Sequence, residues 1–278
     1  MKFKVLKELE IILRYPKVFF FKNNTYIIGS DVVNSKNNQK QYWPCFYKLD
    51  DEFNIISEKK IFETFDRSDI NISLWIRDIN INEEGIFFNF ELKENINNES
   101  YKHNNYLVFT NDLEKFEFVK KYDYNIFIFK DFENRLLMSN LTKDEEFPDF
   151  FWGKYLFEFI INGEKIIPTF DNIVDYKKDK GHLVHDVLKK NGGVYDMLFS
   201  IRHLINNTPD FIYKFYTSKT TDFINFYDTK EIIIENNIND TKWCSYPNIF
   251  KKNTNLYSVT NQDDFGKNKN VLLCKVEL

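Results

Sequence analysis

Five stretches of the chain share one order of residue types: a polar or Pro-containing pair, an apolar run, a turn on Asn, Gly or Lys, and an aromatic run. They are YPKVFFFKNNTYII (15–28), RDININEEGIFFNF (77–90), YNIFIFKDFENRLLM (124–138), HDVLKKNGGVYDMLF (185–199) and YPNIFKKNTNLYSV (246–259). They are 62, 47, 61 and 61 residues apart, counted from Pro16, Asp78, Asn125, Asp186 and Pro247. A period of about 50–60 residues is that of one four-stranded propeller blade. The sequence therefore predicts an all-β protein, a five-bladed β-propeller.

A second repeated element follows the first in two of these units. FTNDLEKFEF (109–118) and YTSKTTDFINF (216–226) each predict an outer strand that ends in a Thr/Ser–Asp turn before an aromatic residue. One or two β-sandwiches, with strands alike in composition alone, are the alternative, but two motifs in a fixed order favour the propeller. We expect a single domain over 1–278 with blades at roughly 10–65, 70–120, 122–175, 180–235 and 240–278, and with 1–9 completing the last blade.

The strands are expected in short segments rich in Ile, Phe, Tyr and Val, bounded by polar turns. The segments are Val18–Phe21, Thr25–Ile28, Gly85–Phe90, Tyr106–Thr110, Asn125–Phe129, Leu136–Ser139, Tyr155–Ile161 and Asn270–Val276, with His182–Lys190 assigned as a strand too. Aromatic residues make up 18% of the chain. Each aromatic ring buried between blades removes roughly 150–250 Å² from water, which would account for this excess.

Charge and hydropathy exclude several partners. Lys and Arg (38) nearly balance Asp and Glu (42), without the basic stripe that nucleic acid would require. No stretch approaches the roughly 18 apolar residues of a membrane helix, and the charged start of the chain does not match a secretory signal, so we expect a cytoplasmic protein.

Cys45, Cys244 and Cys274 lie far apart without a CxxC pair and are expected to be reduced, mostly buried thiols.

The end of the chain resembles a known group of proteins. WCSYPNIF (243–250) and TNQDDFGK (260–267) resemble the last blade of five-bladed, glycoside-hydrolase-like propellers encoded among bacterial surface-polysaccharide genes. Those proteins are similar to the furanosidases of glycoside hydrolase families 43 and 32. Tyr15-Pro16 resembles the first strand of the propeller domain in glucosamine inositolphosphorylceramide transferase-like proteins. The resemblance covers the whole chain as a rhythm of five units, with motif identity confined to the last unit and part of the fourth.

This resemblance implies a protein that acts on a glycosyl unit, by hydrolysis or transfer, during surface-polysaccharide assembly. Its partner would be a glycan or a sugar-containing small molecule, nucleotide- or lipid-linked, and no cofactor is implied. The alternatives are a glycan-binding or assembly module that has lost its catalytic pair, and a propeller that binds other proteins. Fold alone does not decide among them.

Hydrolysis with inversion needs an acid and a base about 6.5–9.5 Å apart. In the furanosidase pattern an Asp in the first blade is the base, an Asp in the second blade positions the acid, and a later Glu is the acid. Tyr15 stands at the first position here, which departs from the pattern. Asp78 matches the second position, and the adjacent Arg77 is expected to hold it ionised, although the two could simply form an ion pair at a strand end.

The third catalytic position falls on GHLVHD (181–186), which carries His182, His185 and Asp186. A His beside a carboxylate transfers protons near neutral pH, so His185 and Asp186 join Asp78 as the predicted catalytic residues. A strand with hydrogen-bonded imidazoles is the alternative interpretation. His182, His185 and Asp186 could also be ligands of zinc, but no third His is near in sequence and no metal is predicted.

Sugar binding is assigned to residues near the starts of the predicted inner strands. Indole rings stack on the apolar faces of sugars, which makes Trp75 and Trp243 the candidate platforms, while Trp43 and Trp152 are expected to pack between blades. The complete predicted binding set is Tyr15, Trp75, Arg77, His182, Trp243, Tyr246 and Asn261. The alternative for the two Tyr-Pro pairs is that each simply begins a strand, where Pro is tolerated.

Overall fold

The computed structural model describes residues 1–34, 40–63, 65, 72–97, 100–122, 125–128, 136–143, 155–161, 164–166, 169–170, 183–189, 192–204, 211–235, 243–264 and 267–277. Every regular element in these ranges is a β-strand, as the sequence predicted. The described residues hold no helix long and apolar enough to cross a membrane. The chain divides into two compact units: an N-terminal unit, Leu9–Leu136, and a C-terminal unit, Met1–Glu8 with Leu137–Leu278.

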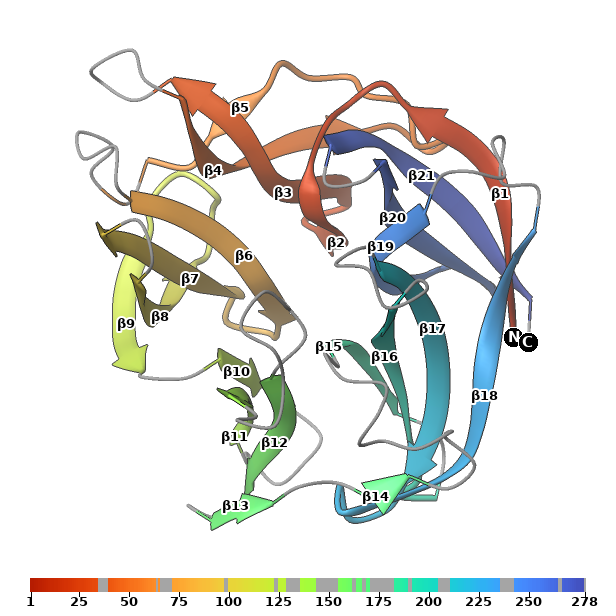
Figure 1. The fold of residues 1–278 in the computed structure, drawn as a ribbon. Coiled ribbons are helices and arrows are strands. Elements are labelled where there is room, and N and C mark those ends of the chain that lie inside the picture. The colour runs from red at the N-terminus through yellow and green to blue at the C-terminus, as the bar shows by residue number, and fades with distance from the viewer. Residues whose placement is uncertain are drawn as a thin grey trace. The chain divides into compact units, whose positions relative to one another are not determined.

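The N-terminal unit contains two antiparallel sheets of four strands, each in chain order (Figure 1). The first sheet is β2 (Arg14–Phe21), β3 (Asn24–Asn34), β4 (Lys40–Leu49) and β5 (Lys60–Ile61). The second sheet is β6 (Ile72–Ile81), β7 (Ile86–Asn97), β8 (Ser100–Thr110) and β9 (Glu117–Tyr122), and β10 (Asn125–Ile128) lies beside β6 and β7. Each strand expected in this unit is found, usually a few residues longer.

Phenylalanines fill the space between these two sheets. Phe88 and Phe90 are two residues apart on β7 and therefore point to one face of the second sheet. Both are fully buried. The ring of Phe88 meets that of Phe19 from β2 at 5.8 Å and that of Phe62, just after β5, at 5.7 Å between centroids. The aromatic excess of the sequence thus becomes inter-sheet packing within this unit.

A buried serine also joins the two sheets. The hydroxyl of Ser30 on β3 donates to the carbonyl oxygen of Leu74 at 3.2 Å and accepts from the N–H of Ile76 at 3.3 Å, so it holds β6 against the first sheet. The neighbouring Gly29 allows the chain before β2 to approach closely, because a Cβ there would lie 2.7 Å from Cβ of Leu13. Together, the Ser30 hydrogen bonds to β6 and the close approach of Gly29 to Leu13 place the start of β2 next to the middle of β6.

The second repeated element of the sequence forms the same turn twice. The Oγ1 of Thr110 accepts a hydrogen bond from the N–H of Leu113 at 3.0 Å. In the same way, the Oγ1 of Thr220 accepts one from the N–H of Phe223 at 2.8 Å. The side chains of Asp112 and Asp222 each accept from two later N–H groups, all at 2.8 Å. A buried apolar residue with positive φ follows each Asp: Leu113 at 65° and Phe223 at 59°. The predicted Thr/Ser–Asp turns are therefore present, but each follows the third strand in its strand order, β8 (Ser100–Thr110) or β17 (Phe211–Thr220), and not an outer strand.

The C-terminal unit contains one extended sheet in the order β15-β16-β17-β18-β1-β21-β20-β19 (Figure 1). Its strands are β1 (Lys2–Leu9), β15 (Leu183–Lys189), β16 (Tyr195–Leu204), β17 (Phe211–Thr220), β18 (Asn225–Glu235), β19 (Trp243–Lys252), β20 (Asn255–Asp264) and β21 (Lys267–Glu277). The unit also contains β11 (Leu136–Lys143), β12 (Tyr155–Ile161) and β13 (Glu164–Ile166), which pair antiparallel, and β14 (Thr169–Phe170), which pairs parallel with β18.

Strand β1 lies between β18 and β21, so the first residues of the chain are part of this sheet. It runs parallel to β18, and Lys2 forms an ion pair with Glu235 at 2.5 Å. Phe3 is fully buried in a core that includes Phe215, Leu272 and Cys274. Cys274, like Cys45 in the other unit, is a buried free thiol, as expected from the sequence.

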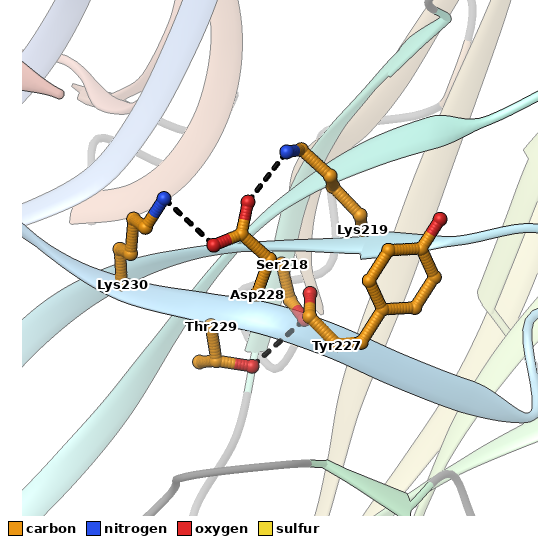
Figure 2. Close-up of polar contacts among 6 residues, drawn as sticks. All are labelled: Ser218, Lys219, Tyr227, Asp228, Thr229 and Lys230. Atoms are coloured by element: carbon orange, nitrogen blue, oxygen red, sulfur yellow. Dashed lines mark hydrogen bonds and ion pairs between the residues drawn. The ribbon is translucent and has the colours of Figure 1, made fainter.

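A bulge in β18 brings an aspartate between two lysines. Asp228 and Thr229 together lie opposite the single residue Ser218, whose hydroxyl is 2.8 Å from that of Thr229. Asp228 takes a φ of 54° at this bulge. Figure 2 shows the result: its carboxylate contacts the ammonium groups of Lys219 at 2.5 Å and Lys230 at 2.6 Å.

This contact predicts a pH effect on stability. Hydrogen bonds from Lys219 and Lys230 lower the pKa of Asp228 to about 2. An unfolded Asp has a pKa of about 3.9, so the contact stabilises the fold above that pH, and the stabilisation disappears as the pH falls towards 2. We expect urea unfolding of Asp228→Asn to show a smaller loss of stability between pH 4 and pH 2 than the wild type. Glu117→Gln, an exposed acid in β9, is the control; identical pH dependence in the wild type and Asp228→Asn would contradict the prediction.

Candidate functional site

The same β-bulge occurs in four strands. Two of them, β2 and β6, are the first strands of the N-terminal sheets, and the other two, β15 and β19, are the end strands of the extended C-terminal sheet. The strand register shifts between Arg14 and Lys17 in β2, Ile76 and Asp78 in β6, Val184 and Asp186 in β15, and Ser245 and Asn248 in β19. The residues inside the shifts are Tyr15-Pro16, Arg77, His185 and Tyr246-Pro247, all within the sequence repeats. A bulge interrupts the ladder and redirects a side chain, and bulges occur preferentially next to active sites. The repeat in the sequence is therefore a repeat in backbone structure.

Proline explains two of these bulges directly. Pro16 and Pro247 have no N–H to donate, so neither can occupy a hydrogen-bonded ladder position facing a partner strand. The preceding Tyr15 has a φ of 55°, a conformation that costs a residue with a Cβ about 1–2 kcal/mol. Strained backbone of this kind gathers at binding and catalytic sites, which makes Tyr15 a focus of the N-terminal unit.

Tyr15 is held between a cation and an indole. The guanidinium carbon of Arg77 lies 4.4 Å from the centre of the Tyr15 ring. On another side Trp75 meets the same ring edge-to-face, with centroids 5.5 Å apart at 79°. The structure thus brings together three residues that the sequence assigned to sugar binding.

Two residues that the sequence analysis did not select complete this group. Tyr42, from β4, stacks on Trp75 with ring centroids 4.6 Å apart, and the guanidinium carbon of Arg14 lies 4.4 Å from the Tyr42 centroid. We call Arg14, Tyr15, Tyr42, Trp75 and Arg77 the Arg–aromatic cluster. Trp75 is 9% exposed, whereas the two tyrosines are half-buried and carry more of the accessible aromatic surface.

Arg77 forms its ion pair with Glu91, a residue of the adjacent strand β7. Both Nε and Nη2 of Arg77 contact Oε2 of Glu91. The side chains are 20% and 5% exposed, respectively, so the pair is largely removed from water. Burial acts to lower the pKa of Arg77, but the charge of Glu91 and the contact with Tyr15 outweigh it and raise that pKa. The ion pair that the structure shows for Arg77 therefore crosses from β6 to β7.

A polar face of the second sheet extends from this pair. Asn89, Glu91 and Lys93 alternate along β7 and therefore share one face, opposite to that of Phe88 and Phe90. Asp78 pairs with Asn89 across the strands, so its half-buried side chain joins this face. Burial lowers the pKa of Lys93. The negative charge of Glu91 acts to raise this pKa, whereas the positive charge of Arg77 lowers it further.

The other predicted residues belong to the C-terminal unit. The structure describes the backbone of His185 and Asp186 at the β15 bulge and of Trp243 and Tyr246 in β19. Asn261, in β20, is buried and pairs with Ser245 beside the β19 bulge. His182 lies outside the described residues. Within the described part of the chain no group of three or more His, Cys, Asp or Glu side chains is arranged to hold a metal ion.

The N-terminal site combines groups that suit a carbohydrate. Half-buried aromatic rings offer apolar faces to sugar C–H groups, and fixed guanidinium and carboxylate groups beside them serve as hydrogen-bond partners for hydroxyls. Because Tyr15 contacts both Arg77 of the ion pair and Trp75 of the stack, the surface is pre-organised and binding need not order it.

No protein-family model and no curated protein sequence matches the chain. Solved structures do resemble it. An alpha-L-arabinanase of Cellvibrio cellulosa complexed with arabinohexaose has 12% identity and a TM-score of 0.53, covering 96% of this chain and 91% of that one. MPT-4, a mannose phosphorylase from Leishmania mexicana in complex with a phosphate ion, has 11% identity and a TM-score of 0.60, covering 100% and 88%. An alpha-L-arabinofuranosidase from Lactobacillus brevis has 10% identity and a TM-score of 0.60, covering 95% and 90%. The chain therefore has the β-propeller fold of glycoside-hydrolase-like proteins.

Proposed function

We propose that this protein acts on a glycosyl unit, by hydrolysis or transfer, in the assembly of a bacterial surface polysaccharide. The observation that carries the proposal is the bulge that recurs in β2, β6, β15 and β19 at the predicted site residues. Each bulge redirects a side chain within its own strand, and bulges occur preferentially next to active sites. The fold shared with carbohydrate-active enzymes supports a sugar as the ligand.

The catalytic roles follow from the chemistry of the residues. His185, with Asp186 beside it, would donate a proton to the glycosidic oxygen as the bond to the anomeric carbon breaks. Asp78 takes the role that the furanosidase pattern gives to the carboxylate of the second blade, and water or an acceptor hydroxyl would add to the anomeric carbon. The proposed sugar-binding residues are Tyr15, Trp75 and Arg77 in the N-terminal unit and His182, Trp243, Tyr246 and Asn261 in the C-terminal unit.

A glycan-binding module without turnover is the second candidate, and Tyr15 favours it. This residue stands where the resemblance expects a carboxylate base, and its ring is engaged by both Arg77 and Trp75. A phenol has a pKa of about 10 in its unperturbed state, so it is a poor general base at neutral pH. Such a module would bind a polysaccharide intermediate and present it to other proteins.

Turnover separates the two candidates. The wild type, Asp78→Asn and Asp186→Asn would be incubated with nucleotide sugars plus acceptor glycans, with aryl glycosides, with arabino-oligosaccharides, and with mannosides plus phosphate. For an enzyme we expect turnover of at least one substrate class and a loss of about 10²–10⁴-fold in each variant. Asp51→Asn, in an exposed turn, should keep full activity. Glycan binding with no turnover in any preparation would support the module.

A further inference from the structure

Among the described residues no carboxylate pairs with Arg14, whereas Glu91 pairs with Arg77. The guanidinium of Arg14 lies over Tyr42 and, at 5.6 Å from the ring centroid, over Trp75. Its Nε is buried and makes no hydrogen bond. The Arg–aromatic cluster therefore carries one uncompensated positive charge.

That charge is costly unless something compensates for it. A half-buried cation loses hydration, and ring contacts return only part of the loss, about 0.5–2 kcal/mol for a cation–π contact. Stacking also fixes the plane of the guanidinium, whose fork of N–H donors matches the oxygens of a carboxylate or phosphate. The position is thus suited to an anionic ligand, since none of the described residues supplies a carboxylate to it.

The charged groups of β6 and β7 near Arg14 are of both signs. Arg77 and Lys93 add two positive charges on β6 and β7, while Glu91 supplies a negative charge next to both. Asp78 brings a second carboxylate to the same polar face.

We infer that the sugar bound at the Arg–aromatic cluster carries an anionic oxygen group, a carboxylate or a phosphate, which Arg14 receives while Tyr15 and Tyr42 contact the sugar ring. This inference rests on the proposed function, because it assumes that the cluster binds a glycan. It assigns the substrate to acidic sugars, either uronic acid type or phosphorylated, and gives Arg14 the role of a specificity-determining residue.

The test compares matched pairs of glycans that differ in charge alone. An immobilised array would present uronate-containing oligosaccharides with their carboxyl-reduced forms, and phosphorylated oligosaccharides with their dephosphorylated forms. We expect the wild type to prefer one acidic series by about tenfold or more, since hydrogen bonds to charged groups are the stronger ones. The preference should weaken with added salt. The two series distinguish carboxylate from phosphate, and competition by inorganic phosphate alone reports whether the sugar is needed.

Variants assign the effect to Arg14. In Arg14→Gln the ratio of affinities for the charged and neutral member of each glycan pair should fall to about one, and Arg14→Lys should restore part of the preference because it returns the charge without the planar fork. Lys22→Gln is the control, since Lys22 lies over the Phe21 ring at 5.3 Å outside the cluster. Circular dichroism and urea unfolding would verify that each variant is folded.

The outcomes separate this inference from the proposed function. The inference would be overturned if the wild type bound the charged and neutral glycans of each pair equally, or if the preference for acidic glycans persisted in Arg14→Gln. Either result would leave the proposed function standing. Binding of no glycan at all by folded protein would overturn both.

Discussion

Arg77→Met is expected to destabilise the protein by about 3–5 kcal/mol, measured by urea unfolding at pH 7. The substitution keeps most of the side-chain volume but removes the charge opposite Glu91, which is only 5% exposed. Breaking a buried ion pair on one side costs this much because the remaining carboxylate is left without a counter-ion.

A second substitution provides the control. Replacing both partners, Arg77→Met with Glu91→Leu, should recover most of the lost stability, because a buried ion pair can often be exchanged for apolar residues at little cost. Arg14→Met, the same change at the other end of the cluster, leaves no buried carboxylate and should cost less. Losses that simply add in the double variant would show that Arg77 and Glu91 are not coupled.

Phe88→Ala is expected to cost about 3–5 kcal/mol, because it empties the centre of the packing between the two sheets of the N-terminal unit. Phe88 is 1% exposed and touches rings from both sheets. The matched control is Phe118→Ala: Phe118 is 55% exposed on β9, and its removal should cost less than about 1 kcal/mol. Similar losses for the two variants in urea unfolding would contradict the packing described here.

Periodicity and turn chemistry explain how much of the fold the sequence predicted. The repeats located the strands that become β2, β6, β10, β15 and β19, and the Thr-x-Asp pattern located both turns. Trp43, expected to pack between blades, is fully buried and donates from Nε1 to the carbonyl of Phe62 at 2.5 Å. These features depend on neighbours in sequence or on side-chain type, both of which can be read without coordinates.

The site was harder to predict because it depends on pairing between strands. Arg77 and Asp78 are adjacent in sequence, but neighbours in a strand normally point to opposite faces, and a bulge changes which face each takes. The pairing of Arg77 with Glu91 follows from the β6–β7 register, and the one signal for it was a Glu within the apolar run FNFEL. Tyr42 and Arg14 join Trp75 from a different sheet, which no spacing along the chain indicates.

The most direct test is to measure, by calorimetric titration, the affinity of the wild type and of Tyr15→Leu for whichever glycan the array identifies. Leucine meets the same backbone strain at φ 55° but offers no ring between Arg77 and Trp75. If the bulged strands present a carbohydrate site, Tyr15→Leu should bind at least about tenfold more weakly while remaining folded. Unchanged affinity in the variant, or a folded wild type that binds no sugar, would contradict the assignment of a carbohydrate site to the bulged strands.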